Sequence, residues 1–356
     1  MIAILSTTHG PGHGAEVVLS ELLRAWHNEA LPLTVVAPPS STAETVASEV
    51  GIPWVPLRTS RDAFLLNVAA GQAANAQLRG CGLIHAWSAR GLELSCWIGR
   101  RLSVPATATL HDHPGALRLT SLRRRLMRLT ANLQDAVAFP SAALEAAWRA
   151  AGFTRRSCII PNGSSACSLR PRDPNRRELV IGFLGMYAPW KGFEIARSWA
   201  RSEWPGHVRW AFFGQTCAEL TDAAAELASE LGHRARFEGA QPRESIFGDL
   251  DILVHCSTAF DPFPTVLLEA AEAGVPVVAS SLGGASEIVV HEETGFLFEP
   301  AAPDVGLAYL RRLAAHPGLR AHLGASGRAR FERLFRAEQM AKGYAAFWKT
   351  SLSAGC

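Results

Sequence analysis

The stretch Asp261-Pro-Phe-Pro-Thr-Val-Leu-Leu-Glu269-Ala-Ala-Glu-Ala-Gly274-Val-Pro276-Val-Val-Ala-Ser280 predicts the local fold of the second half of the chain. Helical spacing of its apolar residues indicates a short helix over Val266–Ala273, which Gly274-Val-Pro276 then ends. The apolar run that follows is typical of a strand buried on both faces. A helix followed directly by a buried strand is one unit of a parallel sheet covered by helices.

The same alternation of short apolar runs and helical patterns extends along the whole chain. In the first half, the strand-like runs are Ile2–Leu5, Leu33–Ala37, Ile52–Leu57, Leu83–Ala86, Ala106–Leu110, Ala136–Phe139 and Cys158–Ile160. In the second half, they are Leu179–Leu184, Val208–Phe213, Ile252–His255 and Val275–Ala279. Helical patterns between them include Ala15–Trp26, Ala63–Leu78 and Ser141–Ala151. We therefore expect an α/β protein with two doubly wound parallel sheets.

A segment rich in Ser, Arg and Pro, without periodicity, separates the two sets of strands. We expect a first domain over residues 1–163, a linker over 164–177, a second domain over 178–335 and a C-terminal helix over 336–356. This last helical pattern is amphipathic and suits either domain, including a return to the first. Two such domains joined by one linker leave a cleft between the carboxyl ends of their sheets, where ligands bind.

Composition excludes several classes of protein. The 356 residues are 48% hydrophobic and 19% charged, which is globular rather than disordered. A net charge of only +3 predicts no nucleic-acid partner. The seven cysteines are dispersed without a CxxC pair, which argues against a disulfide framework and a structural zinc site. No apolar run has the length of a signal core or a membrane span, so we expect a cytoplasmic protein, free or peripheral at the inner face of the membrane.

Two segments at predicted strand ends have features that suit an anion. The first strand leads into a loop with Gly10, Gly12 and Gly14, where the backbone can approach a ligand and the next helix begins. The spacing is not the dinucleotide fingerprint, and a tight turn explains this segment equally well. In the second domain Gly185 ends a strand and Lys191 opens a helix, which suits either a diphosphate partner or a solvated surface lysine.

The quoted stretch contains two acidic residues of interest. Asp261 lies on the loop and Glu269 on the helix, with seven residues between them, so both can face the same cleft. Carboxylates would repel a diphosphate, whereas an ionised oxygen accepts strong hydrogen bonds from hydroxyl groups. We therefore expect this pair to face the hydroxyls of a sugar or a ribose.

Residues 261–280 resemble the signature of glycosyltransferase family 4, in which two acids so spaced precede a helix that ends in Ala-x-Gly-x-Pro-Val. Further segments resemble motifs of the family in the same order: Gly12–Glu16, Leu83–Ser88, Thr109–Asp112, Ile160–Gly163, Gly283–Ile288 and Thr294–Phe298. The resemblance covers nearly the whole chain. It implies the GT-B architecture, two Rossmann-like domains facing each other across a cleft, with the acceptor on the N-terminal domain and the nucleotide sugar on the C-terminal one.

The resemblance also implies a role for each matching residue. Glu269 would bind the ribose, Asp261 would face the transferred sugar, and Lys191 would neutralise the diphosphate. Further donor-binding positions would be Gly12, Gly14, Gly185, Thr265 and Val266. His111 would lie near the reacting carbon, as a third catalytic residue with Asp261 and Lys191. Trp87 and Ser88 would belong to the acceptor side.

The implied reaction moves a sugar from a nucleotide-sugar donor to a hydroxyl acceptor, a saccharide or a lipid-linked one in cell-envelope or exopolysaccharide synthesis. The family retains the anomeric configuration, and the leaving phosphate is the expected proton acceptor. Lys191, backbone amides and a helix N-terminus can stabilise the leaving diphosphate, so we expect no metal and no cofactor besides the donor. A zinc pair at His111-Asp-His113 is disfavoured, because this spacing is commonly plain hydrogen bonding.

The chain departs from the family pattern at four positions. Asp261 stands where Glu is usual, Met186 where Arg is usual, Pro264 where Gly is common, and Trp87 replaces a His. Two alternatives stay open: a nucleotide-sugar epimerase or hydrolase of the same architecture, and a non-catalytic partner subunit. The first would need its own acids, Glu16 or Asp112. The sugar, the base, the acceptor, the linkage and the oligomeric state also stay open.

The stretch Leu117–Leu129 combines five arginines with leucines at helical spacing, Leu119, Leu122, Leu126 and Leu129. One interpretation is a helix that buries its leucines in the domain and shows its arginines to water. The other is a surface on which Arg123, Arg124 and Arg125 attract anionic lipid headgroups or a lipid-diphosphate acceptor.

Overall fold

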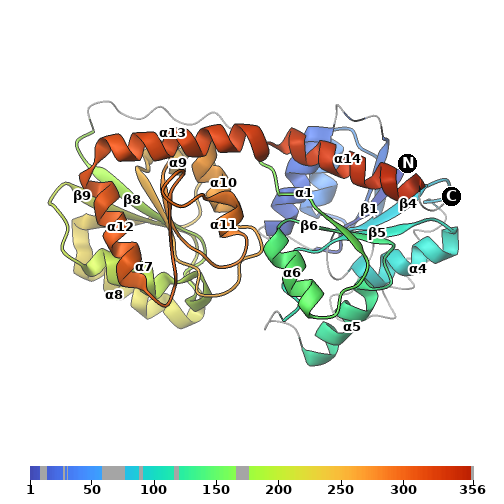
Figure 1. The fold of residues 1–356 in the computed structure, drawn as a ribbon, viewed down its shortest axis with the longest axis horizontal. Coiled ribbons are helices and arrows are strands. Elements are labelled where there is room, and N and C mark those ends of the chain that lie inside the picture. Colours follow the sequence, from blue (N-terminus) through green and yellow to red (C-terminus); the bar gives the residue numbers. More distant parts are fainter. Residues whose placement is uncertain are drawn as a thin grey trace. The chain divides into compact units, whose positions relative to one another are not determined.

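The computed structural model describes residues 1–8, 14–26, 29, 31–57, 77–87, 91–115, 120–165 and 176–353. The chain divides into two compact units, which we call unit 1 (Met1–Ser165 with Arg336–Cys356) and unit 2 (Ala166–Phe335). Figure 1 shows both units, each built from strands and helices. The chain passes from one unit to the other twice, after Ser165 and after Phe335.

Unit 1 is built on a parallel sheet, and its described strands follow the order β3-β2-β1-β4-β5-β6-β7. The strands are β1 (Ile2–Leu5), β2 (Leu33–Ala37), β3 (Trp54–Pro56), β4 (Leu83–Ala86), β5 (Ala106–Thr109), β6 (Ala136–Phe139) and β7 (Arg156–Ile159). The helices are α1 (Gly14–Ala25), α2 (Thr42–Glu49), α4 (Leu92–Leu102), α5 (Ser121–Ala131), α6 (Ala142–Ala150) and α14 (Ala337–Ser353). The central strands β1 and β4 are buried along their whole length, because helices cover both faces of the sheet.

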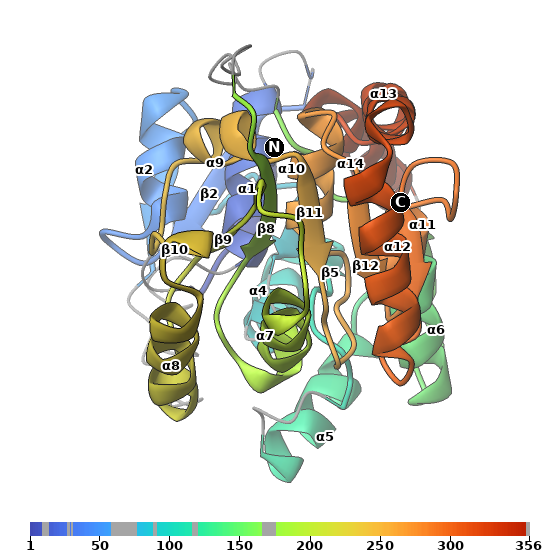
Figure 2. The same ribbon diagram turned by 90° about the vertical axis from the view of Figure 1, so that its left-hand side faces the viewer.

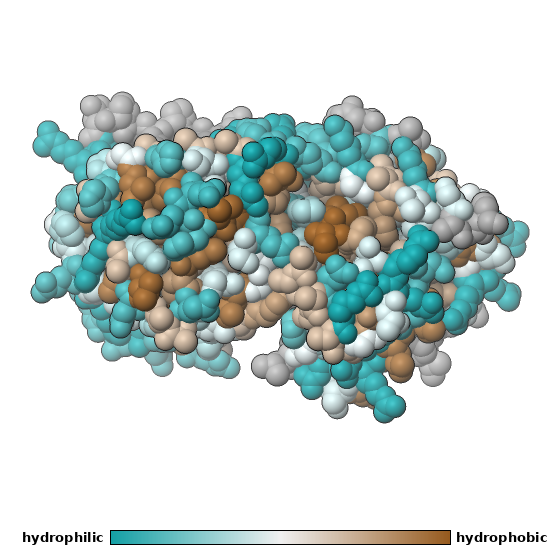
Figure 3. All heavy atoms as spheres, in the orientation of Figure 1, coloured by the Kyte–Doolittle hydropathy of each residue, from teal (hydrophilic) through white to brown (hydrophobic). Residues whose placement is uncertain are grey.

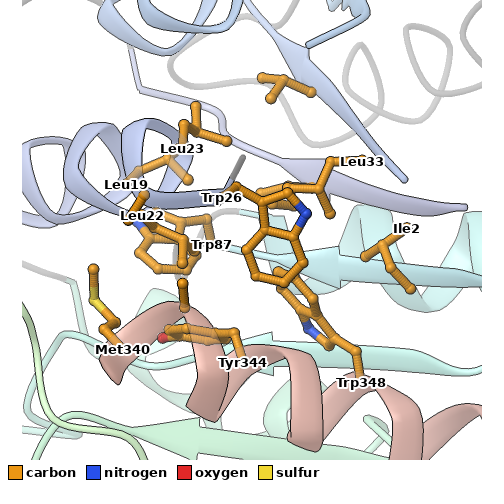
Figure 4. Packing of buried hydrophobic residues seen from close by; sticks show 14 of the residues in the cluster. Ile2, Leu19, Leu22, Leu23, Trp26, Leu33, Trp87, Met340, Tyr344 and Trp348 are labelled. Carbon is orange, nitrogen blue, oxygen red and sulfur yellow. The ribbon is translucent and has the colours of Figure 1, made fainter. Parts of the chain in front are cut away.

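The C-terminal helix α14 packs in unit 1, against α1 and β4. Figure 4 shows Trp26, Trp87, Tyr344 and Trp348 together in this core, and the rings of Trp26 and Trp348 are 5.1 Å apart. The Tyr344 hydroxyl is hydrogen-bonded to Thr109 Oγ1 at 2.9 Å. Aromatic burial and one polar contact thus fix a helix that is remote in sequence to the sheet that begins the chain.

Unit 2 repeats the plan, with described strands in the order β10-β9-β8-β11-β12-β13 (Figure 2). They are β8 (Leu179–Leu184), β9 (Val208–Phe213), β10 (Ala235–Phe237), β11 (Ile252–His255), β12 (Val277–Ser280) and β13 (Phe296–Phe298). The helices are α7 (Phe193–Arg201), α8 (Thr221–Leu231), α9 (Arg243–Asp249), α10 (Thr265–Glu272), α11 (Ala285–Ile288), α12 (Pro303–Ala315) and α13 (Pro317–Leu334). Three 3-10 turns are η3 (Pro189–Lys191), η4 (Ala218–Leu220) and η5 (Gly232–Arg234).

The predicted fold class, two Rossmann-like parallel sheets covered by helices, is confirmed. The structure reproduces seven predicted strands with unchanged bounds: β1, β2, β4, β6, β8, β9 and β11. The apolar runs did not predict β10, because this strand is only three residues long and includes Arg236. Of the predicted helix Ala63–Leu78, residues 63–76 lie outside the described residues.

The domain boundaries fall close to the predicted ones. Unit 1 reaches Ser165 rather than residue 163, because Ser164 pairs with Arg336 in an isolated bridge beside the start of α14. Residues 166–175 of the predicted linker lie outside the described residues. Figure 3 shows polar side chains over most of the face it draws, with apolar patches among them. None of the described helices is long and apolar enough to cross a membrane.

Candidate functional site

The strand order of unit 2 reverses between β8 and β11, so the connections that follow these two strands leave the sheet in opposite directions. Ligands of open α/β sheets bind at such a reversal, outside the carboxyl ends of the strands. One connection runs from Gly185 to Lys191 at the end of η3, and the other from Cys256 to Pro264 at the start of α10. Sheet topology therefore brings the predicted lysine and the first predicted acid to one edge.

Three glycines allow the loops at this edge to pack backbone against backbone. Gly192 has φ +72°, and a Cβ there would lie 1.8 Å from the carbonyl oxygen of Cys256. Gly283 has φ +67°, and its Cβ would lie 2.1 Å from the carbonyl oxygen of Asp261. The next residue, Gly284, donates its N–H to that same oxygen at 2.9 Å. A side chain at either left-handed position would push the loops apart.

Thr258 fixes η3 to the loop after β11. Its main-chain N–H donates to the carbonyl oxygen of Trp190 at 2.9 Å, and its hydroxyl donates to that of Pro189 at 3.0 Å. The residue that follows, Lys191, is thereby held over the segment that leads to Asp261.

Lys191 and Asp261 form an ion pair, with Nζ 2.8 Å from Oδ2. Asp261 is buried, and the Nε2 atom of buried His255 lies 3.7 Å from the same oxygen. Burial by itself raises the pKa of Asp261, but the contacts with His255 and Lys191 outweigh it, so the pKa lies well below its usual range. Asp261 is therefore a carboxylate at neutral pH.

The sequence interpretation missed His255 and the neighbouring Ser257, whose hydroxyl lies 3.2 Å from His255 Nε2. Both belong to the surroundings of Asp261. His255 is the last residue of β11, at the point where the strand order reverses. A polar residue that ends a buried strand at this point was the signal that could have revealed it.

The other predicted donor-binding residues of unit 2 lie on the same two connections or on the helix that follows. Thr265 and Val266 form the first turn of α10 and Glu269 its second, and all three are half-buried. Gly185 has φ +140°, and its oxygen would lie 2.0 Å from a Cβ on Gly214. Thus Gly185 closes the end of β8 against the end of β9.

In unit 1, His111 follows β5 and is half-buried. Its Nε2 atom is buried and has no hydrogen-bond partner among the residues that the structure describes. Burial lowers the pKa of His111 to about 4, so the ring is neutral at pH 7. Its ring centroid is 5.2 Å from that of Trp87.

The assignment of Trp87 to the acceptor surface is wrong. This side chain is fully buried, and its indole N–H donates to the carbonyl oxygen of Ala15 at 2.7 Å. It packs between the rings of His111 and Tyr344, as part of the core in Figure 4. Burying a large aromatic ring stabilises the core, which explains why this residue, directly after a central strand, does not lie on the surface. Gly12 and Ser88 lie outside the described residues, and Gly14 is the exposed first residue of α1.

The helix α5 differs from the first interpretation of the basic stretch, and the second stays a prediction. Arg123 forms an ion pair with the carboxylate of Glu93 on α4, but 26% of its side chain remains exposed, so its assignment to a membrane surface stays a prediction. The helix buries Met127, Thr130 and Ala131. Leu122 is 75% and Leu129 57% exposed, which contradicts the predicted burial of the leucine stripe. Arg125 is exposed and Arg124 half-buried, and Leu119 lies outside the described residues.

No group of three His, Cys, Asp or Glu side chains is close enough to hold a metal ion in the described parts of the chain. At the His111-Asp-His113 segment, the Nδ1 atom of His113 accepts a hydrogen bond from the N–H of Gly115 at 3.1 Å.

Two family models match the chain, one on each unit. Residues 12–165 match the model of "Glycosyltransferase Family 4", and residues 171–330 match that of "Glycosyl transferases group 1". The two matches meet at the boundary between the units and cover nearly all of both.

Curated relatives match over shorter stretches. An uncharacterized glycosyltransferase of Methanocaldococcus jannaschii is 30% identical over 133 residues, which are 36% of this chain and 33% of that protein. The lipopolysaccharide core biosynthesis glycosyltransferase LpsD of Rhizobium meliloti is 35% identical over 108 residues, 29% of this chain and 30% of that protein. The chain thus matches about a third of the length of these two relatives.

Solved structures match along the entire chain. The Anabaena protein HepE, solved in complex with UDP and glucose, has a TM-score of 0.83, with 98% of this chain and 99% of that chain covered. The sequence identity is 22%, so this likeness concerns the fold.

Proposed function

The chain belongs to glycosyltransferase family 4, with the group 1 module on unit 2, and we propose that it transfers a sugar from a nucleotide-sugar donor to a hydroxyl acceptor. The observation that carries the proposal is the 2.8 Å pair of Lys191 and Asp261 at the strand reversal of unit 2. It brings a cation for the diphosphate and a carboxylate for hydroxyls to one place. The match of each curated relative is partial, so activity and substrates are proposed here for this chain.

Lys191 stabilises the leaving nucleoside diphosphate. An ammonium has three N–H groups, and Asp261 takes only one of them at 2.8 Å, which leaves donors for phosphate oxygens. Backbone amides at the start of α10, around Thr265 and Val266, add positive potential at the same edge. Donors fixed before the reaction stabilise charge as it develops on the diphosphate, which is where such catalysis gains most.

The two acids bind hydroxyl groups. Asp261 is ionised, since its pKa lies well below the usual range, and it accepts hydrogen bonds from the transferred sugar. Glu269, in the second turn of the helix that Asp261 precedes, takes the ribose of the donor. Gly185 and, in unit 1, Gly12 and Gly14 complete the donor-binding set. In this arrangement the lysine contacts the charged phosphates, and the two carboxylates contact the uncharged hydroxyl groups of the sugar and the ribose.

His111 acts as a neutral imidazole near the reacting carbon. Its low pKa and its buried Nε2 suit donation to a sugar hydroxyl or positioning of the acceptor. The reaction retains the anomeric configuration, and the leaving phosphate accepts the acceptor's proton. No metal and no cofactor besides the donor is needed when Lys191 and the amides provide the positive charge.

Two relatives guide the choice of substrates. HepE was solved with UDP and glucose, so UDP-sugars are the first donors to test. LpsD is named for lipopolysaccharide core biosynthesis, which supports a saccharide of the cell envelope, free or lipid-linked, as acceptor.

The exposed face of α5 binds an anionic membrane surface. Leu122, Arg125 and Leu129 are spaced i, i+3 and i+7, so they share one side of the helix, and all three are exposed. Met127 on the other side is buried in unit 1. Leucines that enter the lipid interface, beside arginines that meet anionic headgroups, are typical of peripheral membrane helices. The proposed location is the inner face of the cytoplasmic membrane.

Acceptor-dependent release of nucleoside diphosphate tests the activity. UDP-sugars and GDP-sugars are offered with and without extracted envelope glycolipids, and Glu269→Ala is compared with Asp304→Asn, a change of an exposed acid on α12. We expect release only with acceptor, at least a tenfold loss of UDP or GDP binding in Glu269→Ala, and no change in the control. Release without acceptor would indicate a hydrolase or epimerase, and binding without turnover a non-catalytic partner subunit.

Sedimentation with phosphatidylglycerol vesicles tests the membrane surface. We expect salt-sensitive binding that the change of Leu122, Arg125 and Leu129 to Ser removes. The control, Arg100→Ser with Arg101→Ser, changes two exposed arginines of α4. Equal binding by the α5 variant would contradict the proposal.

A further inference from the structure

The indole of Trp190 lies against the ammonium of Lys191. The Nζ atom is 4.3 Å from the ring centroid, within the range of a cation–π interaction. Trp190 is 45% exposed, whereas most of the other tryptophans in unit 2, Trp199 and Trp210 among them, are buried in its core. An exposed indole at the carboxyl edge of the sheet adds little to folding, so its contact with Lys191 requires another explanation.

The backbone of Trp190 is fixed independently of its ring. Its carbonyl oxygen accepts the N–H of Thr258 at 2.9 Å, and the next glycine, Gly192, abuts the carbonyl oxygen of Cys256. The ring is therefore presented from an immobilised turn. Lys191 itself is long and flexible, and ordering such a side chain costs free energy when it binds a ligand.

Lysine is rare in this protein. The chain contains three lysines, Lys191, Lys342 and Lys349, among 35 Lys and Arg residues, and unit 2 contains only the first. An ammonium is a compact charge that rotates its three donors freely, unlike the planar guanidinium. The position of the Lys191 ammonium therefore has to be fixed by neighbouring side chains.

We propose that Trp190 is a positioning residue that holds the Lys191 ammonium against Asp261, ready for the diphosphate of the donor. The inference rests on the proposed function, in which Lys191 is the cation that meets the diphosphate. The indole covers one side of Nζ and the carboxylate takes another, 2.8 Å away. The donors of Nζ that Asp261 does not use remain available for a phosphate. Because the lysine is already ordered, binding does not have to supply the free energy of ordering it.

Fluorinated tryptophans introduced only at position 190 test the electrostatic part of this contact. Fluorine withdraws charge from the ring face and hardly changes its size, so a role in packing alone would not respond. The probes are UDP and GDP, with uridine and guanosine as ligands that lack phosphate. We expect the Kd of the diphosphate to rise stepwise with fluorine number, by about two- to fivefold in total, while nucleoside binding stays unchanged.

Three further variants and one control sharpen this result. Trp190→Phe should weaken diphosphate binding less than Trp190→Ala, and in a Lys191→Gln background the fluorine series should have no effect. The same series at Trp204, a half-buried residue of unit 2 whose N–H donates to Trp199, should leave the Kd unchanged. A Kd that is independent of fluorine at position 190 would overturn the inference. An effect seen only with intact nucleotide sugars would instead assign the indole to stacking on the sugar, and would overturn it too.

NMR of ¹³C-lysine-labelled protein tests the contact without any ligand. Three side-chain signals are expected, and the ring current of Trp190 should displace the Cε and Hε resonances of Lys191 alone. Trp190→Ala should return them to ordinary positions and leave those of Lys342 and Lys349 on α14 unchanged. An unchanged Lys191 resonance would overturn the inference. Failure of the unaltered protein to bind any nucleoside diphosphate would instead refute the proposed function, so the two failures are distinguishable.

Discussion

The two units share one fold plan but place different chemistry at the same point of it. The strand order reverses between β1 and β4 in unit 1 and between β8 and β11 in unit 2. After β8 and β11 come Lys191 and Asp261, charged and in direct contact. After β4 comes the buried ring of Trp87, and after the next strand, β5, the neutral imidazole of His111.

The difference shows that topology fixes where a ligand can bind, whereas the residues at the strand ends decide which ligand it is. The edge of unit 2 has the charges that a diphosphate and sugar hydroxyls require. The edge of unit 1, in the part that is described, presents an uncharged imidazole, which suits a neutral hydroxyl. Each of the following experiments changes one side of this comparison and leaves the other intact.

The largest effects should come from the two cores. Trp348 is fully buried in unit 1 and Trp199 almost fully buried in unit 2. We expect Trp348→Ala to cost about 3–5 kcal/mol of unit 1 stability, and Trp199→Ala to cost a similar amount in unit 2, because each leaves a large cavity. Calorimetry should show two transitions, of which each variant lowers a different one. Variants that shift both transitions equally would refute the division into separately stable units.

The second effect concerns the charged edge of unit 2. Lys191→Gln removes the ammonium from Asp261 and from the incoming diphosphate, so kcat/KM should fall by about 10²- to 10³-fold, as when a preorganised donor to developing charge is lost. Steady-state release of nucleoside diphosphate measures it. The control is Lys342→Gln, an exposed residue of α14 that should keep full activity. Activity within threefold of the unaltered protein would exclude Lys191 from the reaction.

The third effect concerns His111. His111→Ala should lower kcat by about 10- to 100-fold and leave UDP or GDP binding unchanged, because the residue lies in unit 1 and its proposed role is in the transfer, not in binding the diphosphate. Its pKa is lowered to about 4, so the neutral form predominates above that value and is lost as the pH falls through it. The activity of the unaltered protein should therefore be level from pH 6 to 8 with respect to this group. A rise in activity on protonation, below pH 5, would contradict the role of a neutral imidazole.

Sequence patterns predicted the elements that are buried and regular. Continuous apolar runs such as Leu179–Leu184 reveal a strand because a sheet covered on both faces requires apolar side chains at every position. The sequence also predicted that Lys191 and Asp261 lie near one ligand site, since both follow buried strands, but it did not predict the ion pair between them. Short or polar elements such as β10 carry no such signal.

What the sequence could not predict depends on which side chains meet in space. Trp87 replaces a His within a motif at a strand end, and it was assigned to the acceptor side, yet its side chain is part of the core. Its indole packs against Tyr344, which comes from the far end of the chain. In the sequence, nothing distinguishes Arg123 from the other arginines of the basic stretch. Its ion pair with Glu93, thirty positions away, depends on how α5 packs against α4. The sequence likewise shows Trp190 only as an aromatic residue beside Lys191. The 4.3 Å distance between its ring and the lysine ammonium, from which we infer its positioning role, is seen only in the structure.

The smallest effect concerns the buried histidine that joins the sheet of unit 1 to α14. His85 Nδ1 lies 2.9 Å from Thr107 Oγ1, and Nε2 lies 3.0 Å from Thr109 Oγ1, which also contacts Tyr344. Burial, with a smaller contribution from His111, lowers the pKa of His85 to about 3. The unfolded chain binds a proton at this residue near pH 6.5, so the stability that His85 contributes is present above pH 6.5 and is lost as the pH falls towards 3.

Between pH 7.5 and 5.5, His85 should therefore remove about 1 kcal/mol from the stability of unit 1. His85→Gln, which keeps hydrogen-bonding groups for the two threonines but cannot be protonated, should lose less stability over this interval by that amount. Denaturant unfolding of both proteins at the two pH values measures the difference, and the transition of unit 2 is the internal reference. Equal pH dependence in both proteins would mean that His85 binds a proton in the folded core over the same pH range as in the unfolded chain. At pH 5.5 the two threonine hydroxyls would then have to accept hydrogen bonds from a buried imidazolium with no carboxylate among the contacts of its ring in the described part of the chain, which burial strongly disfavours.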